Sequence, residues 1–393
     1  MPQVVNTQRL INFLSGITGV AAGGNAVVNL DLNKRYHRIV LQCKAVNYTG
    51  GTGLATKKIT GSGNNDLTVT PTVVNGQVAS VAVVAGGTGY TTGDTVTITD
   101  KTGQGFVGTV TASGGVVSAV AVTSGGTPSP ISPSTLLTAC KLLVNGVNMR
   151  DITPAIILSI RRSVDLIGPS GNTGVNQASR YDSTVAAAKF SVLADGEFPI
   201  EFTDPSRNRN GLGELNAWDM AGQSTFQLLL SISGSVVNPQ ITGIYEFDYA
   251  RNAVGGTPFL QPVSQHQFSL PIVAGRNDII TLPLAWPITR MWLQGSTAGQ
   301  ITQVEVYQDG NKVCEATTDQ IQEAYARYGF WLGFGYGANN QVNGDFDAAY
   351  IADIDQNIGK ALKCQNSLIV RVYSAIAQTL TIVQETTPSA YAG

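Results

Sequence analysis

The residue types that carry most enzyme chemistry are scarce in this sequence and poorly placed for catalysis. Only two histidines occur, His37 and His266. A nucleophilic triad needs an imidazole that a third group orients, and neither histidine lies near a nucleophile-elbow sequence. Glycine runs such as Gly87-Thr88-Gly89 lack the Lys-Ser or Lys-Thr of a phosphate-binding loop. The sequence therefore predicts a protein that is not an enzyme and glycines that form turns.

One short stretch is crowded with carboxylates and forms a candidate metal site: Asp345, Asp347, Asp353 and Asp355. Clustered carboxylate oxygens are the ligands that Ca²⁺ prefers. The spacing does not follow the twelve-residue calcium loop, so two interpretations stay open. The stretch is either a solvated loop or a structural calcium site that bridges strands or subunits. No cofactor is required, and Ca²⁺ is the single candidate.

An aromatic cluster lies just before these carboxylates and also has two interpretations. It consists of Phe330, Trp331, Phe334 and Tyr336. Such side chains either pack in a core or subunit interface, or form a flat platform on which a sugar ring stacks.

Composition excludes several classes of protein. The chain of 393 residues has 13% charged residues and a net charge of -2, without the basic excess of a nucleic-acid-binding protein. It shows neither a run of 18 apolar residues nor a basic-then-apolar leader, so we expect no membrane span and no export signal. The four cysteines are scattered without a C-x-x-C pair and are interpreted as buried thiols: Cys43, Cys140, Cys314 and Cys364.

An internal repeat predicts a small β module. Eight of fourteen positions are identical between residues 75–88 and residues 114–127. Each copy reads as a turn, a Val/Ala-rich strand and a Gly-Gly turn, and Asp94–Thr99 alternates like a half-buried strand between them. The module ends in a proline-rich linker. We place it at residues 48–136.

A second repeat spans the whole chain. Residues 28–42 match residues 280–294 without a gap, with five of fifteen positions identical at an offset of 252 residues. Further on, an Asn145-Gly146 hairpin turn and a Thr-capped helix match Asp309-Gly310 and a second capped helix, at an offset of 164. The first copy therefore holds 88 extra residues, in the region where the β module lies.

The strand-rich copies predict an all-β protein: two tandem jelly-roll β-sandwiches with a small inserted β module and a few short helices. The expected division is an N-terminal arm over residues 1–24 and a first jelly roll over 25–248, which the module at 48–136 interrupts. A linker over 249–265 and a second jelly roll over 266–393 follow.

Three stretches carry a resemblance to a known family: Tyr36-His37-Arg38-Ile39-Val40-Leu41, Phe198–Pro205 with Arg207 and Arg209 behind it, and Leu215-Asn216-Ala217-Trp218. On these residues the sequence resembles the double jelly-roll major capsid proteins of tailless phages with an internal membrane, of the corticovirus kind. The resemblance covers residues 25–47 and 137–390. It leaves out the module, which looks like the Gly-Gly-Thr-Gly-Tyr β repeats of phage surface proteins. Ser206 stands where family members often carry an aromatic residue.

The resemblance implies a major capsid protein whose homotrimers form pseudo-hexagonal capsomers of an icosahedral phage shell over an internal membrane. The implied partners are further copies, neighbouring capsomers, the inner viral membrane and minor capsid or penton proteins, with no direct contact to nucleic acid. The module is then a candidate for binding a host receptor or glycan. The protein is expected in the virion after synthesis in the host cytoplasm. The alternative is a tandem β-sandwich carbohydrate-binding or adhesin protein with the aromatic cluster as its sugar platform.

The amino-terminal segment is predicted to form a short amphipathic helix over residues 7–14. Its candidate contact residues are Arg9, Leu10, Ile11, Phe13 and Leu14. The helix either docks on its own or a neighbouring subunit or touches the underlying membrane. A single basic residue gives little attraction to anionic lipid.

Overall fold

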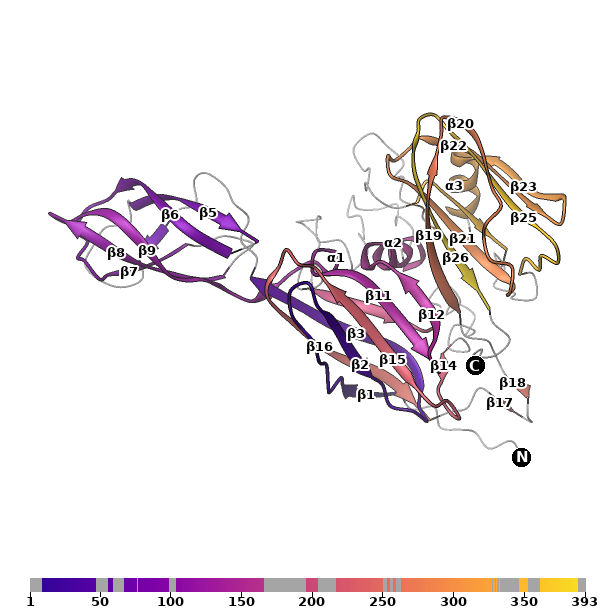
Figure 1. The fold of residues 1–393 in the computed structure, drawn as a ribbon, viewed down its shortest axis with the longest axis horizontal. Helices are drawn as coiled ribbons and strands as arrows, with labels where there is room; N and C mark the ends of the chain where they lie inside the picture. The colour runs from indigo at the N-terminus through magenta and orange to yellow at the C-terminus, as the bar shows by residue number, and fades with distance from the viewer. Residues whose placement is uncertain are drawn as a thin grey trace, which may run out of the picture.

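The computed structural model shows two β-sandwiches side by side, with a smaller β module that projects from the first (Figure 1). It describes residues 9–46, 56–58, 67–75, 77–98, 104–165, 196–203, 217–249, 253–254, 257–258, 263–326, 328, 330, 332, 346–352 and 361–387.

The first sandwich, here the first roll, has jelly-roll connectivity. One sheet has the order β1-β16-β3, with β13 also paired to β3, and the other has the order β2-β15-β11-β12. The short strands β10 (Ser129–Pro130) and β14 (Trp218–Asp219) pair with the two ends of β3. The principal strands are β1 (Leu10–Phe13), β2 (Asn25–Asn29), β3 (Arg35–Val46), β11 (Leu137–Val144), β12 (Val147–Ile152), β13 (Glu197–Glu201), β15 (Phe226–Ile232) and β16 (Val237–Asp248).

The second roll repeats this order strand for strand. Its sheets run β19-β26-β21-β24 and β20-β25-β22-β23. The predicted all-β fold with tandem jelly rolls is therefore confirmed. The strands are β19 (Ser264–Ile272), β20 (Gly275–Ile279), β21 (Ile288–Gly295), β22 (Ile301–Gln308), β23 (Asn311–Thr317), β24 (Ala348–Ile351), β25 (Leu368–Ser374) and β26 (Gln378–Thr386), and the pair β17 (Ala253–Val254) and β18 (Thr257–Pro258) precedes them.

The two copies share even their irregularities. His37 in β3 is an extra residue between the pairs Tyr36↔Phe247 and Arg38↔Glu246, so the ladder bulges there. Thr289 is the extra residue at the same point of β21, 252 residues later. Its carbonyl accepts the amide of Ala352, as the His37 carbonyl accepts the amide of Phe202. A bulge held by its neighbouring strand is a specific feature rather than a defect, so its recurrence supports duplication of one fold.

The predicted Asn-Gly and Asp-Gly turns are confirmed and clamp equivalent loops. Asn145 and Asp309 have positive φ of 52° and 48°. The side-chain oxygen of Asn145 accepts the amides of Ser224 and Thr225 just before β15. The carboxylate of Asp309 likewise accepts three consecutive amides before β25, those of Gln365, Asn366 and Ser367. These backbone hydrogen bonds lower the pKa of Asp309.

The ungapped repeat is wrong by one residue at its beginning. An offset of 252 pairs Val28, which is buried, with Ile280, which is 66% exposed and lies after β20. The sheet pairing shows that Ile279, which is 6% exposed, takes the place of Val28, because both face the equivalent position on the neighbouring strand. The loop after β20 absorbs the extra residue, and Leu30 and Leu282 are again equivalent and buried.

Both predicted helices are present, as α2 (Pro154–Asp165) after Thr153 and α3 (Thr318–Ala326) after Thr317. The predicted capping box forms: the Gln320 side chain accepts the Thr317 amide, and the Thr317 hydroxyl accepts the Gln320 amide. A third helix, α1 (Pro133–Leu136), lies in the predicted proline-rich linker. No described helix has both the length and the apolar character that crossing a membrane requires.

The predicted amino-terminal helix is wrong, because residues 10–13 form the edge strand β1, which pairs with β16. Leu10 and Leu14 pack against the core and Asn12 contacts the Tyr245 hydroxyl, whereas Ile11 and Phe13 are exposed. Leu14 lies four positions after Leu10, a spacing that puts both side chains on one face of a helix or of a strand alike. So short a helix is marginal in water, whereas the strand gains a ready hydrogen-bonding partner.

The inserted module consists of two hairpins with a core of their own. The sequence repeat corresponds to β6 (Gln77–Gly86) and β9 (Val116–Thr127), each the second strand of a hairpin with β5 (Leu67–Val74) or β8 (Gln104–Ser113). Strands β4 (Thr56–Lys58) and β7 (Thr95–Ile98) extend the β8-β9 sheet. The buried side chains form a cluster distinct from that of the rolls, to which β3 of the first roll contributes its last residue, Val46. The members are Val46, Leu67, Val69, Val78, Tyr90, Val96, Ile98, Phe106, Val110, Val117 and Val120.

The two hairpins approach each other reciprocally at a pair of equivalent glycines. A Cβ on Gly86 would collide with the carbonyl oxygen of Val117, and a Cβ on Gly125 would lie 2.8 Å from the carbonyl oxygen of Val78. Val78 and Val117 are themselves equivalent in the repeat. The contact is therefore symmetric, and both glycines are needed for the close backbone approach.

We expect Gly86→Ala and Gly125→Ala each to destabilise the inserted module by about 1–3 kcal/mol, because a rigid backbone oxygen blocks the added methyl group. Scanning calorimetry should show one transition shifted down and the transition of the rolls unchanged. Ala79→Ser, at an exposed position of β6, is the control. An equal shift of both transitions would contradict the separation of the two cores.

Candidate functional sites

A buried charged cluster fixes β3 against the end of β16. The Arg35 guanidinium donates Nε and Nη2 to the two oxygens of Asp248 at 2.9 and 2.6 Å, and His37 Nε2 lies 2.8 Å from Asp248 Oδ2. Asp248 and His37 are 1% exposed and Arg35 is 6% exposed. Burial alone would raise the pKa of Asp248, but the hydrogen bonds from His37 and Arg35 outweigh it and hold that pKa well below its usual range. His37 thus has a positioning role in the fold.

The join between the two rolls is a β-sheet. Strand β12 pairs in parallel with β19, which fuses one sheet of each roll into an eight-stranded sheet. Arg150 is opposite Gln265, and Asp151 is opposite His266. Burial lowers the pKa of His266, although the Asp151 carboxylate opposes this shift.

Side chains reinforce this join on both sides of the paired residues. The buried Ser264 hydroxyl donates to the carbonyl of Met149 at 2.6 Å. The amide of Thr153, at the start of α2, donates to the side chain of Gln267 at 2.9 Å. Met149 and Ser264 are both 0% exposed, so their hydrogen bond is shielded from water. The two rolls are therefore held as one body.

Arg150 also links the join to the aromatic core of the first roll. Its guanidinium lies 5.4 Å from the ring centroid of Trp218 and 5.7 Å from that of Phe202, and it donates to the carbonyl of Glu201 at 2.9 Å. Trp218 belongs to a stretch that carries the family resemblance. Its ring packs 4.9 Å from Phe202, centroid to centroid, so that stretch contributes to the core.

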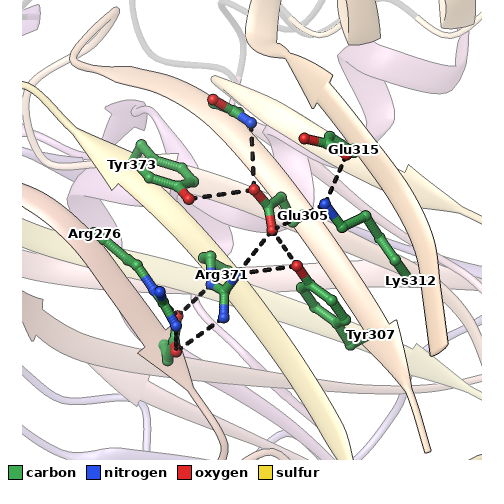
Figure 2. Close-up of polar contacts among 9 residues, drawn as sticks. Arg276, Glu305, Tyr307, Lys312, Glu315, Arg371 and Tyr373 are labelled. Carbon is green, nitrogen blue, oxygen red and sulfur yellow. Dashed lines mark hydrogen bonds and ion pairs between the residues drawn. The ribbon is translucent and has the colours of Figure 1, made fainter. Parts of the chain in front are cut away.

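The β20-β25-β22-β23 sheet of the second roll, here its outer sheet, carries a polar network across its four strands, which Figure 2 shows in close-up. Arg371 on β25 lies at its centre and donates to Asp278 on β20 at 2.7 Å and to Glu305 on β22 at 3.0 Å. Tyr307, Tyr373 and Lys312 also contact Glu305. The hydrogen bond from Tyr307 and the neighbouring cations lower the pKa of Glu305 despite its burial. Every charge in this network has an opposite partner, so the face is ordered but electrically balanced.

Asp347 is the one residue of the predicted calcium site that lies within the described residues, and it has a structural role. Its two carboxylate oxygens accept the amides of Gly295 and Gly299 at 2.6 and 2.7 Å, which fixes the loop between β21 and β22. Burial raises the pKa of Asp347 in spite of these bonds. Asp345, Asp353 and Asp355 lie outside the described residues, so the calcium site stays a prediction. Across the described ranges, no group of three or more His, Cys, Asp or Glu side chains is arranged to hold a metal ion.

The aromatic cluster is also described at one residue, Phe330, which is 1% exposed. It packs 6.4 Å from Trp292, centroid to centroid, beneath the guanidinium of Arg290. Such a buried ring offers no sugar platform. Trp331, Phe334 and Tyr336 lie outside the described residues.

The amino-terminal candidate residues divide between the two faces of β1. Arg9 lies 3.9 Å from Glu246, and Leu10 and Leu14 face the core. Ile11 is 63% exposed and Phe13 is 80% exposed. These two apolar side chains form a patch on an edge strand that no described strand covers on its outer side.

The four cysteines are free thiols, and burial raises the pKa of Cys43 and Cys140 to about 12. Cys314 and Cys364 are only half-buried, so the interpretation of all four as buried thiols was too broad.

Sequence reasoning missed the cluster at Asp248 and the network at Arg371. Asp248 and Arg35 are 213 residues apart, so no local spacing signals their contact. The network left a weak signal in the sequence. On each of β22 and β25, a charged residue and a tyrosine lie two positions apart and so share one face of the strand: Glu305 with Tyr307, and Arg371 with Tyr373.

The sequence matches no protein-family model and no curated protein. Solved structures, in contrast, match over nearly the whole chain. The major capsid protein P2 from bacteriophage PM2 has 13% sequence identity and a TM-score of 0.55, over 97% of this chain and 98% of that chain. The STIV major capsid protein has 9% identity and a TM-score of 0.51, over 97% of each chain.

The fold is that of the double jelly-roll capsid proteins. The same eight-strand order in both rolls and the shared sheet at the join agree with this match. At such low identity the likeness concerns architecture, and the function requires an argument of its own.

We expect Asp248→Asn to destabilise the fold by about 3–5 kcal/mol at pH 7, because it leaves Arg35 buried without its counter-charge. The pKa of Asp248 is lower in the folded than in the unfolded chain. Its stabilising effect is therefore fully present above about pH 4 and is lost as the pH falls toward the folded-state value. Urea unfolding at pH 7 and at pH 3 should show that the variant loses less stability on acidification than the parent.

The matched control is Glu315→Gln, which removes an exposed carboxylate paired with Lys312 and should change stability little. Equal effects of the two substitutions would show that the Asp248 cluster does not stabilise the fold.

Proposed function

We propose that this protein is a non-enzymatic major capsid protein whose homotrimers form the pseudo-hexagonal capsomers of an icosahedral phage shell over an internal membrane. The observation that carries the proposal is the pair of equivalent jelly rolls joined through β12 and β19. Two such rolls in one chain, taken three times around an axis, give six similar units. Six similar units make a tile that packs efficiently on a curved surface.

The surface is consistent with an assembling protein. Few residues are charged, and those on the outer sheet of the second roll neutralise one another, as in the network at Arg371. Mutual repulsion between copies is therefore weak. The proposed partners are further copies, neighbouring capsomers, minor capsid or penton proteins and the inner membrane, and the proposed location is the virion.

For the domain division we propose the expected one, with the first roll over 25–248, the module over 48–136, a linker over 249–265 and the second roll over 266–393, and with two bounds adjusted to the strands. Strand β1 (Leu10–Phe13) belongs to a sheet of the first roll, and β19, the first strand of the second roll, begins at Ser264. The module projects from the end of the first roll away from the second roll (Figure 1). An insertion there leaves the sides of the rolls free to pack. We propose that the module faces outward and contacts a host receptor, a glycan or a neighbouring trimer.

Native mass spectrometry of the purified full chain should show a species near three times 41.2 kDa. Negative-stain images of that species should have a hexagonal outline, because the six rolls are nearly equivalent. A glycan-array screen of the same sample tests the adhesin alternative. A monomer at all concentrations that binds glycans would contradict the capsid proposal.

A further inference from the structure

The join between the rolls pairs one edge strand of the first roll with one edge strand of the second. Each roll also has the strand that is equivalent to the other roll's joining strand, and that strand is a free sheet edge among the described residues. The join pairs β12 of the first roll with β19 of the second. Their counterparts are β23 of the second roll and β1 of the first. Both counterparts end their sheets, and no described strand pairs with their outer sides.

The counterpart of β12 is defined by register. In β12, Arg150 pairs with Leu142 of β11, and the residue before it, Met149, is an extra residue that makes a bulge. In β23, Cys314 pairs with Val306 of β22, and the residue before it, Val313, is the extra residue of an equivalent bulge. Cys314 is therefore equivalent to Arg150, and Val313 is equivalent to Met149.

The counterpart of β19 is defined in the same way. Gln265 of β19 faces Glu385 of β26, and Ile11 of β1 faces Glu246 of β16. Glu385 and Glu246 are themselves equivalent, since they face Arg290 and Arg38 across the ladder. Ile11 therefore corresponds to Gln265, and by the same count Asn12 corresponds to His266.

Burial differs sharply between the used and unused edges. At the join, Met149 and Arg150 are 0% and 4% exposed. At the unused edges, Val313 is 41% exposed, Ile11 is 63% exposed and Phe13 is 80% exposed. Two positions that are polar at the join are less polar or apolar at the unused edges: Cys314 stands where the join has Arg150, and Ile11 stands where it has Gln265. Apolar side chains provide the driving force that separate chains need in order to associate.

We propose that β23 of one copy pairs in parallel with β1 of the next copy, in the register of the internal join, with Cys314 opposite Ile11 and Glu315 opposite Asn12. This contact rests on the proposed function, since it names the interface that closes the capsomer. It is heterologous, so its repetition produces a ring when the rotation closes. Within one chain, β1 and β23 lie on the far sides of the two rolls, so they meet only between copies (Figure 1).

The register predicts a disulfide after one substitution. Ile11→Cys would place a thiol opposite the native Cys314 of the neighbour, and partners on adjacent strands lie within the Cα separation of about 4.4–6.8 Å that a disulfide needs. Diamide serves as oxidant: the two thiols give up two electrons and two protons to it and form one S–S bond. We expect most of the variant to run as covalent multimers, up to the closed trimer, on non-reducing gels.

Two controls fix the register. Ile11→Cys combined with Cys314→Ser should give no covalent multimer, which excludes the other thiols. Phe13→Cys, which the same register places opposite Ala316, should cross-link at least tenfold less. Ile11 and Phe13 are exposed, so we expect Ile11→Cys and Phe13→Cys to keep the parent melting temperature. An independent readout is iodoacetamide labelling of Cys314 in the unmodified protein, which should be slower in the trimer than in a diluted monomer.

The outcomes separate this inference from the proposed function. A trimer by native mass spectrometry that fails to cross-link through Ile11→Cys overturns the strand register and leaves the capsid proposal intact. A monomer at all concentrations overturns both. A third result would also overturn the inference: Phe13→Asp that leaves the trimer intact but abolishes flotation with phosphatidylglycerol vesicles would assign the β1 patch to lipid.

Discussion

The parallel pairing of β12 with β19 is the constraint on which the shape of the molecule depends. Without it no sheet would run from one roll into the other. The register itself is short, but Ser264 and Gln267 extend it with hydrogen bonds to backbone groups of the first roll. Because Met149 and Ser264 are fully buried, the Met149 carbonyl needs a protein partner, and a slipped register would leave it unsatisfied. The angle between the rolls is therefore determined by hydrogen bonding as well as by packing.

Charge is used sparingly, and part of it is buried. The chain is 13% charged, yet several of its charged side chains are buried in pairs beside the central ladders of the rolls. The pairs Arg38–Glu246 and Arg290–Glu385 occupy equivalent positions in the two copies. Arg290 and Glu385 are both buried, whereas Glu246 is buried and the Arg38 side chain is 37% exposed. A pair with a buried member contributes little net stability but penalises any arrangement that leaves the buried charge alone. Their recurrence indicates that they specify the register of β3 with β16 and of β21 with β26.

Much of the architecture could be predicted from the sequence because duplication makes local signals appear twice. Asn145 and Asp309 marked equivalent turns, and Thr317 with Gln320 marked a helix start. Local spacing failed where it was ambiguous, as for Leu10 and Leu14, or where one extra residue shifted the frame, as at Ile280. Local spacing carries no information on contacts between residues that are distant in the sequence. The cluster at Asp248 and the join through Arg150 depend on partners more than a hundred residues away, and only the folded chain brings them together.

The inserted module has a hydrophobic cluster distinct from the core of the rolls, and the two adjoin at Val46 of β3, which belongs to the module's cluster. Away from this boundary, a change of side chain in one cluster is not transmitted directly by packing to the other. This separation lets natural selection alter the interior of the projecting part while the two rolls stay constant. A lineage could acquire or discard the whole projection without rebuilding the two rolls.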